Sequence, residues 1–237
     1  MLTSFEQWVI NKVMPLRKVI LATGEFYHVV NRGVASSLIF TSAWDYQRFL
    51  SLLNYYRYSD TSLSFSNFNS LPKEKQVAFW DNLKKDGKLG IEIFAYCLMP
   101  NHFHLLLRQT KEKGIQTALA NLQNGYSKYF NLKYERKGPL FQSRFMAVRI
   151  EEDSLFIHVS RYIHLNPATA YLLEVDKLLT YRWSSFSEYM GKVASGFLSK
   201  DLILKMIGGI DRYREFVRDQ TSYQRELDKI KHLILEK

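Results

Sequence analysis

The sequence predicts an α+β fold in which helices pack on an antiparallel sheet. Segments with strand-like alternation are interleaved with segments of helical spacing, and two strand segments are joined by a tight turn, as in an antiparallel hairpin. At 237 residues, 46% of them hydrophobic, the chain can bury a core as one main domain with a smaller appendage. We place the main domain at residues 19–190 and a small C-terminal helical region at residues 191–237.

The first part of the chain predicts a strand, a helix and a polar insertion. Residues 26–33 (FYHVVNRG) are typical of a strand that ends in a turn at Gly33, and His28 lies within it. Residues 45–60 repeat apolar side chains at spacings of three and four, which indicates a helix over one sheet face. Residues 61–87 are polar except for a short amphipathic piece, and we assign no function to this insertion.

The rest of the main domain supplies further strands and helices. The predicted strands cover residues 91–98, 102–108 and 141–150. The predicted helices cover residues 114–138 and 151–166. Gly138-Pro139 is a stop signal for the first helix, and Pro167 is expected to end the second by forcing Asn166 toward an extended conformation.

Charge and cysteine usage indicate the class of partner and the compartment. The net charge of +10, from 33 Lys and Arg against 23 Asp and Glu, favours a polyanion, with nucleic acid as the leading candidate. The single cysteine, Cys97, lies in an apolar run and is expected to pack as a small hydrophobe in a reducing compartment. We find neither an apolar run long enough for a membrane span nor a signal-peptide pattern, so we expect a cytoplasmic protein.

Two histidines on one predicted strand form the first candidate site. Because side chains alternate along a strand, His102 and His104 share one face. Neutral imidazole nitrogens are good ligands for a divalent metal. With 6 histidines in the chain such a pair also arises by chance, so a packing role stays open.

A polar stripe on a predicted helix is the second candidate element. His158, Tyr162 and Asn166 are spaced by four residues and therefore lie along one side of the helix. A separate apolar stripe can face the sheet and leave Tyr162 toward a cleft: Phe156, Val159 and Ile163. A tyrosine with an unperturbed pKa near 10 needs help as a nucleophile, which a divalent cation supplies by polarising a phosphate. Most of the 15 tyrosines are expected to be packing residues.

A basic and aromatic block lies between these two elements. Cations that could hold phosphates interleave with aromatic side chains, of which one or two could stack unpaired bases. Only Glu135 opposes the cations within the block. With Arg32 from the first strand, the candidate nucleic-acid-binding residues are Lys128, Lys133, Arg136, Lys137, Arg144 and Arg149.

Several motifs together resemble a known family. In order, they are YHVVNRG, YCLMPNHFHLLL, YSKYFNLKYERKGPLFQSRF, SRYIHLNP and YRWSSFSEYMG, covering residues 26–191. The chain resembles the single-tyrosine HUH transposases, especially the REP-associated tyrosine transposase branch, in which HFH is the histidine-hydrophobic-histidine signature.

The resemblance implies a ferredoxin-like sheet with the histidines on a central strand. It implies Mg²⁺ or Mn²⁺ held by His102, His104 and Asn166, and Tyr162 as the nucleophile on hairpin-containing single-stranded DNA. Attack leaves a 5′-phosphotyrosine and a free 3′-hydroxyl. The covalent intermediate keeps the bond energy, and the sequence has no GxxxxGK[ST] loop for ATP.

Other functions remain open on the sequence alone. One is a binding module of the same fold that recognises hairpin DNA or RNA without cutting, and another is a metal-dependent hydrolase of small phosphoesters. Tyr126 and Tyr129 are the next candidates for a nucleophile, while His158 and His164 are left out of the catalytic set. A homodimer, in which the tyrosine acts on a partner's site, is also left open.

Overall fold

The computed structural model describes residues 20–59, 61–86 and 88–219 and contains a four-stranded sheet of order β2-β3-β1-β4. The strands are β1 Phe26–Arg32, β2 Ile91–Met99, β3 His102–Gln109 and β4 Met146–Ile150. Every neighbouring pair is antiparallel. With a strand-helix-strand-strand-helix-strand chain order, this arrangement is ferredoxin-like and confirms the predicted fold class.

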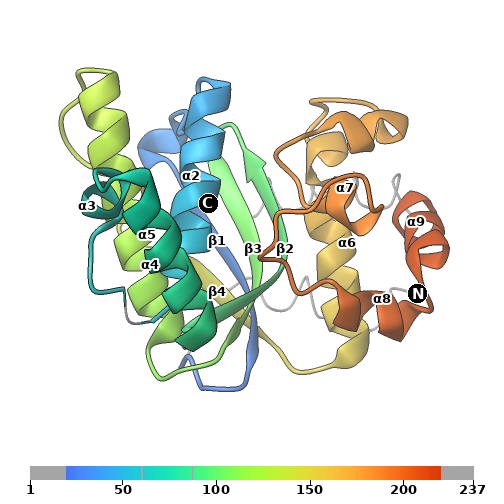
Figure 1. The fold of residues 1–237 in the computed structure, drawn as a ribbon. Coiled ribbons are helices and arrows are strands. Elements are labelled where there is room, and N and C mark those ends of the chain that lie inside the picture. The colour runs from blue at the N-terminus through green and yellow to red at the C-terminus, as the bar shows by residue number, and fades with distance from the viewer. Residues whose placement is uncertain (1–19, 60, 87, 220–237) are drawn as a thin grey trace.

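Helices cover both faces of the sheet (Figure 1). On one side lie α2 Ala43–Tyr56, α3 Phe65–Asn69, α4 Lys73–Asp86 and α5 Gly114–Lys133. On the other side lie α6 Asp153–Thr169, α7 Phe186–Tyr189, α8 Asp201–Ile207 and α9 Ile210–Arg218. The described residues also contain two 3₁₀ turns, η1 Val34–Ser36 and η2 Val175–Thr180. In the described part of the chain, no helix is long and apolar enough to cross a membrane.

The sheet separates two hydrophobic cores. Alternate residues of the strands, such as Tyr27 and Leu105, are buried against α2 and α5. The residues between them, such as Leu106 and Cys97, are buried against α6 and the elements that follow it. Cys97 therefore packs as the predicted small hydrophobe, and burial raises the pKa of its thiol above the ordinary value.

The strand predicted over residues 141–150 is only half formed, because β4 begins at Met146. The pair Val30–Met146 is followed by an isolated bridge between Gly33 and Phe141. Between these two pairs β1 contributes two residues and the later segment four, so the extra residues loop out. The apolar alternation before Met146 therefore belongs to a loop in which Phe141 is buried, and it does not reflect strand pairing.

Pro167 does not end its helix at Asn166, contrary to the prediction, because α6 continues to Thr169. A proline removes the hydrogen bond that its own nitrogen would donate one turn back, to Ile163, and its ring crowds that carbonyl, but the hydrogen bonds of the residues after it can still form. The carbonyl of Asn166 still accepts from Ala170 N at 2.9 Å, which keeps the final turn helical.

Helix α5 ends at Lys133, before the predicted stop at Gly138-Pro139. Glu135 adopts the left-handed conformation with φ 50°, which breaks the helical path. The carbonyl of Asn131 then accepts from Arg136 N at 2.9 Å. The basic segment after α5 is therefore a loop rather than a helical extension.

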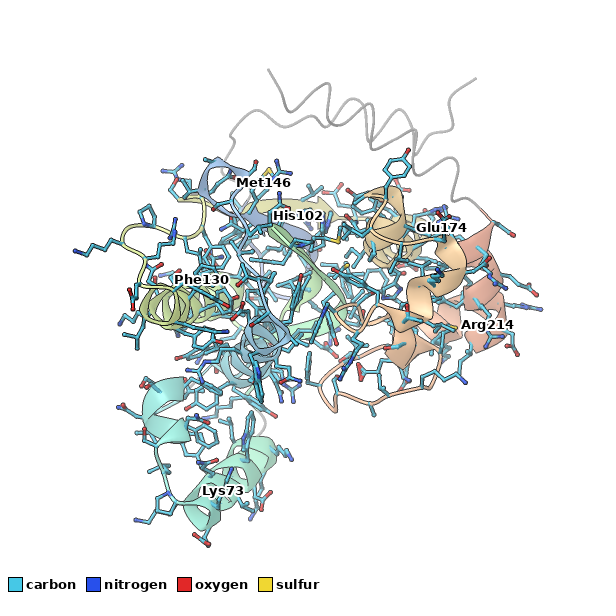
Figure 2. All side chains as sticks on the ribbon, turned by 90° about the horizontal axis from the view of Figure 1, so that it is seen from above. Lys73, His102, Phe130, Met146, Glu174 and Arg214 are labelled. Carbon is cyan, nitrogen blue, oxygen red and sulfur yellow. The ribbon has the colours of Figure 1, made fainter. Side chains whose placement is uncertain are left out.

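The insertion and the C-terminal region attach to opposite sides of the molecule. The predicted amphipathic piece belongs to α4, which with α3 forms a projection whose labelled Lys73 lies far from His102 (Figure 2). Helices α8 and α9 pack against α6 and bury Ile203 and Tyr213. The division between residues 190 and 191 stays a prediction, and residues 19 and 220–237 lie outside the described residues.

Candidate nucleic-acid-processing site

His102 and His104 lie together on β3, as predicted from strand alternation. Both side chains are on the α6 face of the sheet, and their ring centroids are 4.9 Å apart. His104 is 5% exposed, whereas His102 at the strand start is half-buried. The pair therefore sits at the border between the second core and solvent.

The β2–β3 turn fixes the orientation of His102. Asn101 Nδ2 donates to Ser36 O at 3.3 Å, which leaves Asn101 Oδ1 to accept from His102 Nδ1 at 2.6 Å. In a neutral imidazole with its proton on Nδ1, Nε2 carries the lone pair that a metal requires. The turn is itself held because Pro100 O accepts from Ile39 N at 2.8 Å.

A third histidine, His28 on β1, belongs to this cluster and was not assigned a role from the sequence. His28 Nε2 and His104 Nδ1 share a hydrogen bond of 3.0 Å, and their rings stack with centroids 5.2 Å apart. Where His104 Nδ1 donates this bond, its Nε2 carries the lone pair. The sequence shows that His28 lies on a strand, but only the register that pairs Val30 with His104 brings the two rings together.

Tyr162 lies beside these histidines in the same chain. Its ring centroid is 5.6 Å from that of His104 and 5.7 Å from that of His28, with both pairs edge-on. The side chain is half-buried. As predicted, a separate apolar stripe of α6 is buried in the second core: Phe156, Val159 and Ile163.

Asn166, the predicted third metal ligand, is 4% exposed one turn after Tyr162. Its Nδ2 donates to Tyr162 O at 3.0 Å, so its amide is tied to the backbone of the tyrosine helix. This bond orients Oδ1, the atom able to bind a cation, away from that carbonyl. The ligand role itself stays a prediction.

The donor set is compatible with a divalent metal. In the described residues, no group of three or more His, Cys, Asp or Glu side chains could hold an ion by itself. His102 and His104 supply two oriented imidazoles, and the oxygen of Asn166 is the available third donor type. The amide oxygen is the donor type that both Mg²⁺ and Mn²⁺ prefer, while the two imidazoles add nitrogen donors.

His158 and His164, on either side of Tyr162 in the sequence, form hydrogen bonds that stabilise α6 and its packing. His164 is fully buried, with Nδ1 2.7 Å from Tyr213 Oη and Nε2 2.8 Å from Ser185 Oγ. Burial lowers its pKa to about 3, so the ring stays neutral. Nδ1 of His158 lies 2.7 Å from a guanidinium nitrogen of Arg161. These contacts agree with leaving both histidines out of the catalytic set.

Arg32 is the predicted nucleic-acid-binding residue nearest the histidines. It is paired with His102 in the β1–β3 register, so the two share the α6 face of the sheet. Its Nε is buried and has no hydrogen-bond partner among the described residues. A buried donor without a partner is costly, which makes this atom a natural contact for an anion.

The other predicted cations divide into engaged and exposed groups. Arg136 donates to Pro139 O at 2.8 Å, and Arg149 pairs with Glu25 at 2.9 Å. Lys133 pairs with a buried carboxylate on α2. The three remaining cations have exposed side chains on or after α5: Lys128, Lys137 and Arg144.

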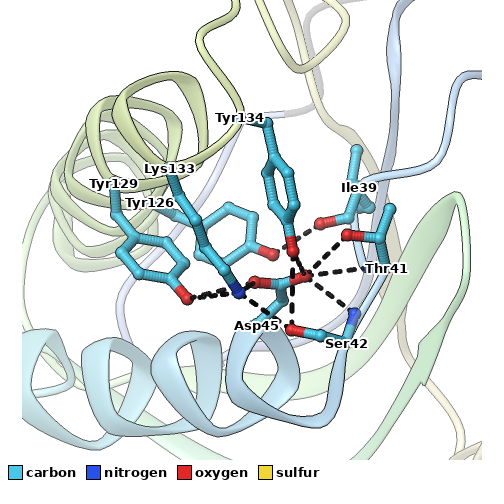
Figure 3. A network of polar contacts seen from close by, with 8 residues as sticks. All are labelled: Ile39, Thr41, Ser42, Asp45, Tyr126, Tyr129, Lys133 and Tyr134. Atoms are coloured by element: carbon cyan, nitrogen blue, oxygen red, sulfur yellow. Dashed lines mark hydrogen bonds and ion pairs between the residues drawn. The ribbon is translucent and has the colours of Figure 1, made fainter.

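The carboxylate of Asp45 joins α2 to the end of α5 (Figure 3). It accepts from Lys133 Nζ at 2.7 Å, Tyr134 Oη at 2.8 Å, Tyr129 Oη at 3.0 Å and backbone N–H groups that include Thr41 N at 2.9 Å. Burial alone would raise its pKa, but the hydrogen bonds outweigh it and hold the pKa of Asp45 well below the ordinary value.

Tyr126 and Tyr129 are therefore packing residues on the face opposite to the histidines. Tyr126 is fully buried and donates to Ile39 O. Burial raises the pKa of both phenols above the ordinary value. Neither of these two tyrosines lies near the histidine cluster, so Tyr162 is the candidate nucleophile that the fold brings to it.

A match to a known protein family agrees with the motifs. A family described as "Transposase IS200 like" matches residues 74–166, a range that includes His102, His104 and Tyr162, and this match confirms the family resemblance. No curated protein sequence matches the chain significantly. A solved structure described as the REP-associated tyrosine transposase bound to a REP hairpin aligns with a TM-score of 0.48 and 17% identity, covering 79% of this chain and 90% of that one.

Proposed function

Since residues 74–166 resemble the IS200-like transposases, we propose that this protein nicks and rejoins hairpin-containing single-stranded DNA through Tyr162. The observation that carries the proposal is the placement of the Tyr162 ring 5.6 Å from His104 within a single chain. A phenol beside two oriented imidazoles is the arrangement that a metal-assisted attack on phosphate requires.

In the proposed reaction, Tyr162 Oη attacks the phosphorus of a phosphodiester. A bond forms between this oxygen and phosphorus, and the bond from phosphorus to the 3′ oxygen of the preceding nucleotide breaks. The phenol proton is released and the departing 3′ oxygen takes up a proton, which leaves a 5′-phosphotyrosine and a 3′-hydroxyl. A 3′-hydroxyl reverses the step at a new junction, so no external energy source is consumed.

We assign the metal site to His102, His104 and Oδ1 of Asn166, with Mn²⁺ or Mg²⁺ as the ion. When bound, the ion supplies Lewis-acid polarisation of the phosphate under attack. His28 is assigned a positioning role, since accepting a hydrogen bond from His104 Nδ1 would leave His104 Nε2 with the lone pair that binds the ion.

DNA contacts are assigned to cations not engaged within the protein. Arg32 is proposed to bind a phosphate next to the histidines, because its buried Nε has no partner among the described residues. Exposed cations of α5 and its loop are proposed to hold the remainder of the strand: Lys128, Lys137 and Arg144. We propose a smaller contribution to DNA binding from the cations that already bind groups of this chain, which are Lys133, Arg136 and Arg149.

The experiment that tests the proposal is incubation with labelled single-stranded hairpin DNA and Mn²⁺, followed by a denaturing gel. We expect a covalent adduct that requires the metal and that is lost when His102 and His104 are both replaced by Ala. The same variant should retain hairpin binding, since phosphate contacts supply most of that affinity.

Tight hairpin binding without an adduct, across several substrates and both metals, would instead favour a non-catalytic hairpin-binding regulator. An adduct that persists in the double-histidine variant would remove the histidines from the mechanism.

Replacing His28 with Ala is expected to weaken Mn²⁺ binding about 10- to 100-fold, because losing an orienting hydrogen bond has that typical effect on metal sites. The measurement is a titration of free Mn²⁺ by electron paramagnetic resonance. His158→Ala is the matched control, as His158 lies one turn before Tyr162 on the same helix and contacts Arg161 and Phe216. Equal affinities in wild type and His28→Ala would contradict the positioning role.

A further inference from the structure

The flank of α6 away from Tyr162 carries buried polar side chains within an apolar core. Ser160 and His164 are fully buried, as is Tyr213 of α9, which packs against them. Tyr213 Oη lies 2.9 Å from Ser160 Oγ and 2.7 Å from His164 Nδ1. One hydroxyl from the C-terminal region therefore joins two successive turns of the helix that bears Tyr162.

The chain of hydrogen bonds continues to the sheet. His164 Nε2 lies 2.8 Å from Ser185 Oγ, and that oxygen accepts from Tyr96 N on β2 at 2.9 Å. At the other end, Ser160 Oγ donates to Ile157 O at 2.7 Å. The helix is thus connected to α9 on one side and to the sheet backbone on the other.

The hydrogen bonds form one continuous chain from Ser185 through His164 and Tyr213 to Ser160, and the tautomer of His164 decides which atom donates at each step. The two serine hydroxyls also contact the backbone, Ser185 Oγ at Tyr96 O and Ser160 Oγ at Ile157 O. Such a network is complete only while all its members are present, because a buried polar group left without a partner is destabilising.

Arg161 makes a second connection between the same two helices. It is 3% exposed, its Nη1 donates to Phe216 O at 3.3 Å, and its guanidinium carbon lies 4.0 Å from the centre of the Phe216 ring. Residues on two faces of α6 therefore contact α9.

The position of these bonds limits rotation of α6 about its axis. Ser160 and His164 lie one turn apart, and each is about 200° around the helix from Tyr162. A rotation that moved Tyr162 away from His104 would separate both residues from Tyr213. The bonds therefore oppose that rotation directly.

We propose that Tyr213 is a positioning residue for the tyrosine nucleophile, and that α9 thereby forms part of the catalytic unit. This inference rests on the proposed function of Tyr162. Tyr213 touches neither the histidine cluster nor the reacting atoms, and it acts by fixing the rotation of α6. The C-terminal helical region thus has a role that its helical sequence pattern alone did not suggest.

The test compares Tyr213→Phe with wild type. The change removes one oxygen and keeps the ring, which packs on Tyr189 with centroids 4.7 Å apart. We expect the single-turnover rate of adduct formation at saturating DNA to fall about 10- to 100-fold, as for a small misplacement of a nucleophile. Hairpin affinity should be unchanged, and amide hydrogen exchange within α6 should become faster.

Arg214→Ala is the matched control on α9, since Arg214 pairs with Asp211 and not with α6. Rates are compared well below each variant's melting temperature, so that loss of folded protein does not contribute. An unchanged adduct rate with unchanged exchange in α6 would overturn the proposal. If wild type forms no adduct, the proposed function fails, whereas the exchange measurement still reports whether Tyr213 holds α6.

Discussion

Replacing Tyr162 with Phe is expected to abolish covalent attachment to DNA while leaving hairpin binding largely intact. The substitution removes only the attacking oxygen and keeps the ring, whose centroid lies 5.7 Å from that of His28. Loss of a nucleophile typically costs about 10⁴-fold or more in rate, which places the adduct below detection. A denaturing gel for the adduct and a native gel for binding provide the two readouts.

The matched control is Tyr171→Phe, just beyond the end of α6. Its side chain is 65% exposed, so the same chemical change there should leave the adduct at the wild-type level. An adduct that persists in Tyr162→Phe would move the nucleophile to another residue. Tyr126 and Tyr129 would be poor replacements, because burial and the Asp45 network hold their hydroxyl groups on the opposite face of the sheet.

Replacing Asp45 with Asn is expected to lower the free energy of unfolding at pH 7 by about 1–3 kcal/mol, the typical cost of leaving buried hydrogen-bonding groups without a matching partner. Asp45 is fully buried and accepts from Lys133 and Tyr134, which an amide cannot match at both oxygens. Urea denaturation measures the change. Glu112→Gln is the control, since Glu112 is an exposed carboxylate near the start of α5.

The difference between wild type and Asp45→Asn should also depend on pH. Since the pKa of Asp45 is held below the ordinary 3.8, the folded protein keeps the carboxylate charged where the unfolded chain takes up a proton. The stabilisation by the Asp45 carboxylate is therefore complete well above the ordinary pKa of 3.8. Below that pKa it is lost by about 1.4 kcal/mol for each pH unit. A difference that stays constant from pH 7 to pH 3 would show that Asp45 does not titrate in this way.

The elements that follow a local period were predictable from sequence. Alternation along residues 102–108 placed His102 and His104 on one face, and helical spacing put Phe156 and Ile163 in the core beside a polar stripe with Tyr162. These predictions succeeded because the side-chain period of a strand or helix is a property of the local backbone.

Local signals failed where another segment decided the conformation. The alternation over residues 141–150 predicted one long strand, but pairing with β1 leaves part of it looped out. Pro167 was expected to stop α6, yet neighbouring hydrogen bonds and packing against the sheet maintain the helix to Thr169. Within the basic block, some cations pair with groups of this chain and others are exposed, and their spacing in the sequence does not reveal which are which.

The sequence alone therefore determined the α+β order, the shared face of His102 and His104 and the family resemblance. Only the tertiary structure added His28 to the site, brought Tyr162 beside it in the same chain and connected Tyr213 to the tyrosine helix. The reason is physical: these contacts join segments that are far apart in the chain, and strand register and helix docking, rather than local periodicity, decide which of them meet.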